Sequence, residues 1–244
     1  MPITDFKLEY NSITENNKGV PVVIVAAGSS SRMGGIDKIL AQICGIPVIA
    51  RTMLAFERNK NVSEIVVVTK EESIADVEKL ANEYMITKLT TVVKGGNCRI
   101  ESVEKGIALL NDKYSAAMIH DGARPLISDN LISAMAQASL NYDCAVCGTK
   151  VKDTLKYVNG EKTETPDRSK MYAVQTPQTV NLKVYRKLLS ECSDKSSFTD
   201  DASVMEAAGY KTEIIEGEET NIKITTPLDL KLADFYIKEI EICE

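Results

Sequence analysis

Short apolar runs rich in β-branched residues alternate along this chain with segments of helical periodicity, and this alternation limits the possible folds most strongly. Strands are predicted at residues 22–26, 64–69, 89–93 and 116–120, and helices at 47–58, 71–84 and 98–110. Because continuous apolar strands separated by helices must be covered on both faces, the pattern predicts an α/β fold around a mostly parallel sheet. Ligands of such sheets bind beyond the carboxyl ends of the strands.

The second half of the chain departs from this alternation. Residues 150–170 are polar, with Asn159-Gly160 as a hairpin turn signal, and they predict a β-arm that projects from the sheet. Such an arm either contacts a partner subunit or is a solvated excursion. We then expect a return through 171–176, a strand at 211–216, and helices at 182–191, 201–208 and 227–240. Residues 20–244 are expected to form one domain after a polar extension at 1–19.

Composition and charge exclude several classes of protein. The chain has 244 residues, of which 44% are apolar, and a net charge of −6. A sizeable core is therefore expected, whereas a general nucleic-acid binder is not, and an anionic ligand must be held by a local basic cluster. No run of about 18 apolar residues occurs, and residues 1–19 are unlike a signal peptide, so we expect a cytoplasmic protein that does not contact membranes.

The six cysteines do not form a metal or redox site by their spacing. Only Cys144 and Cys147 make a C-x-x-C pair, and within a strand their side chains would point to opposite faces. No second pair or histidine cluster completes a zinc ligand set. Scattered thiols of this kind agree with the reducing cytoplasm.

The loop after the first strand carries the clearest ligand-binding signal. The strand ends at Ala26-Ala27-Gly28, small residues follow, and Arg32 and Lys38 bracket them. Backbone N–H groups at such a turn can approach an anion, and the two cations add full positive charge there. The segment has neither the dinucleotide-binding G-x-G-x-x-G pattern nor that of a P-loop. It predicts a nucleotide or sugar-phosphate site, with a plain structural turn as the alternative.

Two further loops fall at the same edge of the predicted sheet. After the third strand, Gly96 allows close backbone approach, and Arg99 and Ser102 share one helix face. This arrangement suits a contact to a base, ribose or phosphate, or simply a helix start with a solvated arginine. After the fourth strand, Asp121 is placed to hold a divalent cation or a hydroxyl, and Arg124 to orient Asp121 or touch phosphate.

His120 is the only histidine of the chain. As the last strand residue it is expected to point away from Asp121 and to take no part in catalysis. Without a second histidine, catalytic triads and histidine-based acid–base chemistry are nearly excluded. Nucleotidyl transfer needs neither, because a phosphate nucleophile is already an anion at pH 7. Positioning, cationic side chains, backbone N–H groups and Mg²⁺ suffice.

Polar clusters farther along the chain suit a second substrate. They cover residues 165–168, 173–179, 198–203 and 221–227. Each cluster alone also fits a cap, a turn or a solvated surface, and 198–203 has the composition of a helix start. Lys223, in what we interpret as an otherwise apolar strand, is the residue that packing explains least.

Together these motifs resemble the 2-C-methyl-D-erythritol 4-phosphate cytidylyltransferase family. The resemblance rests, in family order, on residues 26–38, 95–102, 120–125, 152–154, 173–178, 199–203 and 221–227. It implies a Rossmann-like fold, a homodimer whose β-arms interlock, and dependence on Mg²⁺. It also implies an activity: attack of the acceptor's phosphate on the α-phosphorus of CTP, with release of pyrophosphate.

The resemblance implies roles for individual residues as well. Three catalytic cations would surround the α-phosphate: Arg32, Lys38 and Lys223. Residues binding CTP would be Ala26, Ala27, Gly28, Gly96, Arg99, Ser102 and Gly122. The acceptor would contact Asp121, Thr176, Thr199 and, carried by the arm of the second subunit, Arg168. Asp121 would also support Mg²⁺, which would be held mainly by the CTP phosphates.

Three features depart from the family pattern, and two alternative functions stay open. Ser30 replaces a common glycine, Asp37-Lys38-Ile39-Leu40 replaces the more usual Pro-Lys-Gln, and residues 1–19 have no counterpart. A ribitol 5-phosphate cytidylyltransferase would use the same chemistry, but residues 121–124 and 199–203 look more like the methylerythritol branch. A non-catalytic nucleotide-binding protein is the other alternative, and retention of the site's cations argues against it.

Overall fold

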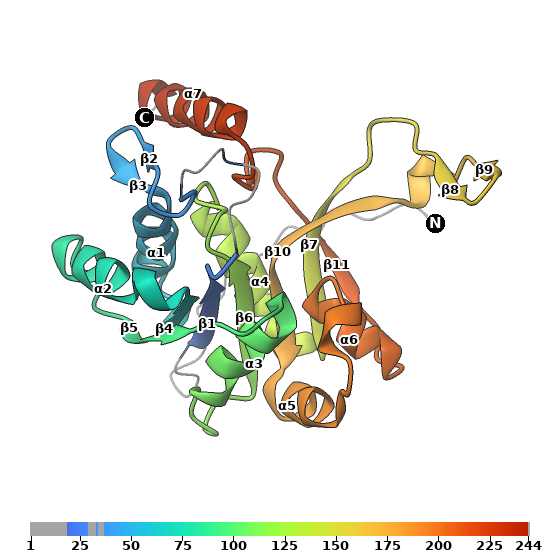
Figure 1. The fold of residues 1–244 in the computed structure, drawn as a ribbon, viewed down its shortest axis with the longest axis horizontal. Coiled ribbons are helices and arrows are strands. Elements are labelled where there is room, and N and C mark those ends of the chain that lie inside the picture. Colours follow the sequence, from blue (N-terminus) through green and yellow to red (C-terminus); the bar gives the residue numbers. More distant parts are fainter. Residues whose placement is uncertain (1–18, 29–32, 34–36, 244) are drawn as a thin grey trace.

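The computed structural model describes residues 19–28, 33 and 37–243, and within them a central mixed sheet carries the fold (Figure 1). Its seven strands lie in the order β11-β7-β10-β6-β1-β4-β5. They are β1 (Val20–Val25), β4 (Val62–Thr69), β5 (Leu89–Lys94), β6 (Ala116–Asp121), β7 (Cys144–Lys150), β10 (Tyr172–Asn181) and β11 (Glu213–Glu216). Only β10 runs antiparallel to its neighbours β6 and β7, so the predicted α/β fold with a mostly parallel sheet is confirmed.

Helices cover both faces of the sheet, as the apolar strands require. One face packs against α1 (Val48–Arg58), α2 (Ile74–Glu83) and α4 (Asp129–Asn141). The other face packs against α3 (Arg99–Ala108), α5 (Leu182–Glu191) and α6 (Asp201–Ala207). Successive residues of β1 alternate between the two cores, with Val22 and Ile24 in the first and Val23 in the second. This period of two fixes the register of β1, since a shift of the strand by one residue would move each side chain to the opposite face of the sheet.

The two cysteines of β7 follow the same alternation. Cys147 belongs to the core under α1 and α4, whereas Cys144 belongs to the core under α5 and α6, which confirms the prediction that they face apart. Both are free and fully buried. Burial raises the pKa of Cys144 to about 11 and that of Cys147 to about 12, so neither thiol is a nucleophile at neutral pH.

A third, smaller layer was not predicted. The hairpin of β2 (Gln42–Ile43) and β3 (Ile46–Pro47) turns at Cys44 and Gly45, which have φ angles of 45° and 76°. With α7 (Pro227–Cys243) it encloses a separate cluster of buried apolar residues. Within the described ranges, no helix has the length and apolar character needed to cross a membrane.

Residues 150–170 leave the body of the protein as an arm (Figure 1). Its tip is a hairpin of β8 (Tyr157–Asn159) and β9 (Lys162–Glu164), and Gly160 takes the left-handed φ of 59° that the turn needs. The short 3₁₀ segment η3 (Arg168–Lys170) follows; two others are η2 (Glu71–Ser73) and η4 (Lys195–Ser197). The predicted projecting arm is therefore confirmed, whereas its contact with a second subunit stays a prediction.

His120 lies in β6 with its ring in the core. It packs edge-on against Phe56 of α1, on the opposite face from Asp121, as expected. Its Nε2 is 3.1 Å from the carbonyl oxygen of Arg124, which can only accept, so Nε2 carries the proton. Nδ1 then accepts from the Thr176 hydroxyl, 3.1 Å away. Burial lowers the pKa of His120 to about 4, so the ring is neutral at pH 7 and cannot exchange protons with a ligand.

This single buried histidine should give the protein a measurable pH dependence of stability. Because the unfolded chain has a His pKa near 6.5, it binds a proton that the folded state rejects between about pH 6.5 and pH 4, so stability falls as the pH falls. We expect a loss of about 2 kcal/mol in the free energy of unfolding between pH 7 and pH 5. Urea titrations of the wild type and His120→Gln measure it; an equal slope in the variant would contradict the assignment.

Candidate functional site

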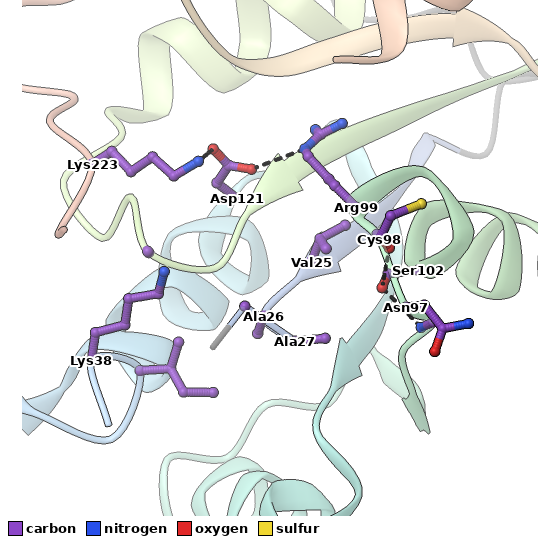
Figure 2. A pocket seen from close by; sticks show the side chains of 14 residues that line it. Val25, Ala26, Ala27, Lys38, Asn97, Cys98, Arg99, Ser102, Asp121 and Lys223 are labelled. Carbon is purple, nitrogen blue, oxygen red and sulfur yellow. Dashed lines mark hydrogen bonds and ion pairs between the residues drawn. The ribbon is translucent and has the colours of Figure 1, made fainter. Parts of the chain in front are cut away.

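A cavity of about 330 Å³ opens at the carboxyl ends of β1, β5 and β6 (Figure 2). The sequence placed three loops at this edge, and the structure brings all three together. Nine of the predicted site residues line the cavity: Ala26, Ala27, Gly28, Lys38, Gly96, Arg99, Ser102, Asp121 and Lys223. Arg32, predicted as a catalytic cation, and Ser30, which departs from the family pattern, lie outside the part of the chain that the structure describes.

Asp121, the last residue of β6, is the electrostatic centre of the cavity. One carboxylate oxygen is 2.8 Å from Nζ of Lys223 and 3.6 Å from Nε of Arg124, and the other is 3.5 Å from Nε of Arg99. Burial alone would raise the pKa of Asp121. Lys223 and Arg99 outweigh burial, with help from Arg124, and hold the pKa well below its usual range. Asp121 is therefore an anion that fixes and partly neutralises a cationic wall.

Arg99 begins α3 and is bracketed by two carboxylates. Its Nη2 donates to Oδ2 of Asp201 at 2.7 Å, while its Nε faces Asp121 (Figure 2). Burial would lower the pKa of Arg99, but Asp201 and Asp121 outweigh it and raise the pKa, so the guanidinium is always charged. The alternative in which Arg99 is a solvated side chain at a helix start is therefore excluded. Arg99 is a fixed cation in the cavity wall.

The glycine loop before α3 forms another part of the cavity wall. The Gly96 N–H donates to Oγ of Ser102 at 3.0 Å, and that hydroxyl donates to the Cys98 carbonyl oxygen at 3.0 Å. A Cβ on Gly96 would lie 2.3 Å from Cβ of Glu101, so no larger residue fits this turn. Ser102 therefore ties the loop to the first turn of the helix while lining the cavity.

Lys38 reaches the cavity from a turn that Asp37 organises. A Cβ on Gly28 would lie 3.3 Å from Nζ of Lys38, which shows how closely the ammonium approaches the end of β1. The Asp37 carbonyl oxygen accepts from the N–H groups of Leu40 at 3.2 Å and Ala41 at 2.9 Å. Its carboxylate pairs with Lys70 at 3.0 Å. Asp37, which departs from the family pattern, thus holds the turn that carries Lys38.

Lys223 lies in a loop, so the predicted strand at this position is wrong. The segment contacts the turn after β6 and Thr176 in the middle of β10, and single hydrogen bonds replace a ladder. Ile224 N–H donates to the Ala123 carbonyl oxygen at 2.8 Å, and Arg124 donates to the Asn221 carbonyl oxygen at 2.7 Å. The fully buried Asn221 donates from Nδ2 to the Thr176 carbonyl oxygen at 2.9 Å. These bonds hold Lys223 over Asp121.

Four predicted site residues are not in the cavity lining. Gly122 follows β6, and a Cβ there would lie 2.9 Å from Cβ of Ala26. Thr176 is buried, and its hydroxyl accepts from the Asp121 N–H at 3.0 Å, so within this chain it supports Asp121 from behind. Arg168 is exposed in the arm, where Nη1 donates to the Lys152 carbonyl oxygen at 2.7 Å. Thr199 is exposed just before α6. Their substrate contacts stay predictions.

The sequence model of the 2-C-methyl-D-erythritol 4-phosphate cytidylyltransferase family matches residues 20–239, which is most of the chain. The chain belongs to this family. Among its named members, that of Halalkalibacterium halodurans is 37% identical over 223 residues, covering 90% of this chain and 97% of the relative. That of Caldanaerobacter subterraneus subsp. tengcongensis is 37% identical over 230 residues, covering 90% and 99%. The resemblance found from the motifs is confirmed.

Solved structures of family members share the fold. The 4-diphosphocytidyl-2C-methyl-D-erythritol synthase of Anaerococcus prevotii superposes with a TM-score of 0.81 at 28% identity, covering 91% of this chain and 97% of that one. The 2-C-methyl-D-erythritol 4-phosphate cytidylyltransferase of Thermus thermophilus gives a TM-score of 0.73 at 28% identity, covering 90% and 99%. The predicted Rossmann-like architecture is therefore the architecture of this family.

The structure also connects to this site residues for which the sequence predicted no role of their own. Tyr185 was predicted only as part of a helix, and Asp201 only as part of a helix start and of the motif 199–203, without a role of its own. The structure joins them to Arg99 through hydrogen bonds. A buried phenol usually needs a polar partner, but sequence spacing does not say which one. Asn221, like Asp201, lies in a motif on which the resemblance rests, although no role was predicted for it.

Proposed function

We propose that this chain transfers CMP from CTP to 2-C-methyl-D-erythritol 4-phosphate, giving 4-diphosphocytidyl-2-C-methyl-D-erythritol and pyrophosphate, a step of isoprenoid precursor synthesis by the non-mevalonate pathway. The observation that carries the proposal is one cavity lined by Lys38 together with Asp121 and two of its cationic partners, Arg99 and Lys223, at the edge where the family's CTP motifs meet. The chain's membership of the family selects this reaction among nucleotidyl transfers.

The chemistry follows from charge. An oxygen of the acceptor's phosphate, already an anion, attacks the α-phosphorus of CTP in line. The bond between that phosphorus and the oxygen bridging to the β-phosphate breaks, and pyrophosphate leaves with the oxygen. No proton moves, which fits a site whose nearest histidine is neutral and walled off in the core. Lys38 and Lys223 would neutralise charge that builds on the reacting phosphates, and preorganised cations of this kind lower the barrier most.

The residues around the cavity fit Mg²⁺ only as an ion that arrives on the nucleotide. Within the described ranges, no group of three or more His, Cys, Asp or Glu side chains could hold a metal. Asp121 is the carboxylate in the cavity lining, and its oxygens already face cations. Mg²⁺ is commonly bound by one or two carboxylates plus substrate phosphates. We propose Asp121 as its protein contact; the ion would neutralise the triphosphate.

The acceptor side of the site is proposed to need a second subunit. Arg168 and Thr199 are exposed and outside the cavity lining, and the tip of the arm exposes 57% of Tyr157 and 64% of Val158. Interlocking arms would cover these apolar side chains and bring Arg168 to the neighbouring cavity. Sedimentation equilibrium should give twice the 26.8 kDa chain mass, and a monomer at micromolar concentration would contradict this.

We also propose a cytoplasmic location for the protein, which the buried free thiols of Cys144 and Cys147 fit.

The test of the function is a comparison of acceptors. Purified protein with CTP and Mg²⁺ should release pyrophosphate when 2-C-methyl-D-erythritol 4-phosphate is added and not when it is omitted. Release with ribitol 5-phosphate alone would change the acceptor and keep the chemistry. Binding of CTP without turnover on either acceptor would identify a non-catalytic nucleotide-binding protein.

A further inference from the structure

A buried phenol and carboxylate lie behind Arg99, outside the residues that line the cavity. Tyr185 of α5 is fully buried, and its hydroxyl donates to Oδ1 of Asp201 at 2.8 Å. Asp201, also fully buried, accepts from Nη2 of Arg99 at 2.7 Å through its other oxygen. The three side chains come from α5, α6 and α3, which pack together on one face of the sheet (Figure 1).

Asp201 is held from its backbone as well as from its side chain. Oε1 of Gln178 in β10 accepts from the N–H groups of Asp201 at 2.9 Å and Ala202 at 3.0 Å. Nε2 of Gln178 donates to Oδ2 of Asp200 at 2.9 Å, and Oδ1 of Asp200 caps α6 by accepting from Ser203 N–H at 3.0 Å. The start of α6 is therefore fixed to the sheet, and the Asp201 carboxylate has a defined position.

Two carboxylates compete for Arg99. Its contact with Asp201 is 2.7 Å, whereas its contact with Asp121 is 3.5 Å. Within the described ranges, Nη1 of Arg99 is buried without a hydrogen-bond partner, so these carboxylates are its anchors. If Asp201 released the guanidinium, Asp121 would be the remaining charge partner within reach of Arg99. Arg99 would then compete for the Asp121 carboxylate with Lys223, whose Nζ is 2.8 Å from it.

We propose that Tyr185 and Asp201 are positioning residues for nucleotide binding: they hold Arg99 in the cavity wall and keep it from closing onto Asp121. The inference rests on the proposed function, because it takes CTP as the ligand of this cavity. Tyr185 orients the carboxylate by occupying Oδ1, which leaves Oδ2 for Arg99. Burial and the neighbouring Asp201 raise the pKa of Tyr185 well above its usual value, so the phenol stays a donor at every working pH.

A purely structural role would predict lost stability without a change at the cavity. The test therefore measures CTP binding by calorimetry with Mg²⁺ and no acceptor, alongside melting temperatures. Tyr185→Phe should raise the Kd for CTP about three- to tenfold, the scale of one lost hydrogen bond. Asp201→Asn should raise it about ten- to hundredfold, because a charge-assisted bond is lost. The KM for the acceptor should stay within about twofold in Tyr185→Phe, since Arg99 is proposed to contact the nucleotide.

Tyr114→Phe is the matched control. Tyr114 donates to the Glu64 carboxylate at 2.8 Å, like Tyr185 to Asp201, but Glu64 is not one of the carboxylates that anchor Arg99. Its Kd for CTP should equal that of the wild type. In an Arg99→Lys background, Tyr185→Phe should change the Kd no further, because the effect travels through the guanidinium.

The outcomes separate the inference from the proposed function. If the wild type binds CTP and Tyr185→Phe binds it equally well, the positioning role is wrong and the function stands. A further rise in Kd on adding Tyr185→Phe to Arg99→Lys would also overturn it, because the phenol would then act by another route. If the wild type does not bind CTP, both the inference and the proposed function fail. Should Asp201→Asn not fold, Tyr185→Phe decides the question alone.

Discussion

Lys223→Ala is expected to lower kcat/KM on the order of 10²–10³-fold while the protein stays folded. Among the ion pairs of the described residues, the one between Lys223 and Asp121 is the shortest that Asp121 makes, at 2.8 Å, and the Lys223 side chain is 38% exposed, so removing it takes charge from the cavity without opening the core. Lys223→Gln keeps most of the length and a hydrogen-bond donor but not the charge. It should lose nearly as much activity, because the transition state needs the charge.

Lys211→Ala is the control for this prediction. Lys211 also pairs with a carboxylate, Glu213, at 3.0 Å, but it is 86% exposed and away from the cavity. Its steady-state kinetics and melting temperature should match the wild type, since exposed ion pairs contribute little. Near-normal turnover in Lys223→Ala, or an equal loss in Lys211→Ala, would remove Lys223 from the proposed chemistry.

Asp121→Ala is expected to destabilise the protein on the order of 3–5 kcal/mol and to abolish turnover. The substitution would leave Arg99, Arg124 and Lys223 facing one another without the anion that holds them. Because that anion is buried, repulsion among the cations is weakly screened by water. Asp121→Asn should lose less stability, since the amide fills the same space. Urea unfolding at pH 7 measures both, and wild-type stability in Asp121→Ala would contradict the electrostatic account.

Acid unfolding measures the contribution of the Asp121 carboxylate to stability in an independent way. The pKa of Asp121 is lower in the folded protein than in the unfolded chain, so its stabilising effect is complete above about pH 4 and is lost as the pH falls further. This window lies below the one in which His120 acts, so the two groups can be separated. Asp121→Asn should flatten the unfolding curve below about pH 4 and leave the His120 slope unchanged.

Structural features whose residues lie close together in the sequence could be predicted from it. The apolar run of β1 and the small residues after it are adjacent in sequence, so one segment predicted both the strand and the cavity-lining residues Ala26, Ala27 and Gly28. The same holds for the start of α6, where Asp200 caps the helix as its position suggested. Parallel strands also share one edge, so three separate loops could be assigned to one site before any contact was known.

Contacts between distant segments were not predictable in this way. β10 was expected as a short return over 171–176, yet it continues to Asn181, because residues 178–181 pair with β6 and the buried Gln178 side chain bonds to the start of α6. The Lys223 segment looked like a strand because its apolar residues fill the core under α7, although its backbone bonds follow no ladder. The Tyr185–Asp201–Arg99 chain joins three helices, and no spacing within one helix encodes it.

The most direct test of the central claim follows oxygen through the reaction. The acceptor, 2-C-methyl-D-erythritol 4-phosphate, is prepared with ¹⁸O in the phosphate and incubated with CTP, Mg²⁺ and the protein, and the products are read by mass spectrometry. If the acceptor's phosphate attacks the α-phosphorus, all of the label should be found in a cytidine-containing diphosphate, and the pyrophosphate should be unlabelled. Labelled pyrophosphate, free CMP as the cytidine product, or no labelled diphosphate would contradict the account.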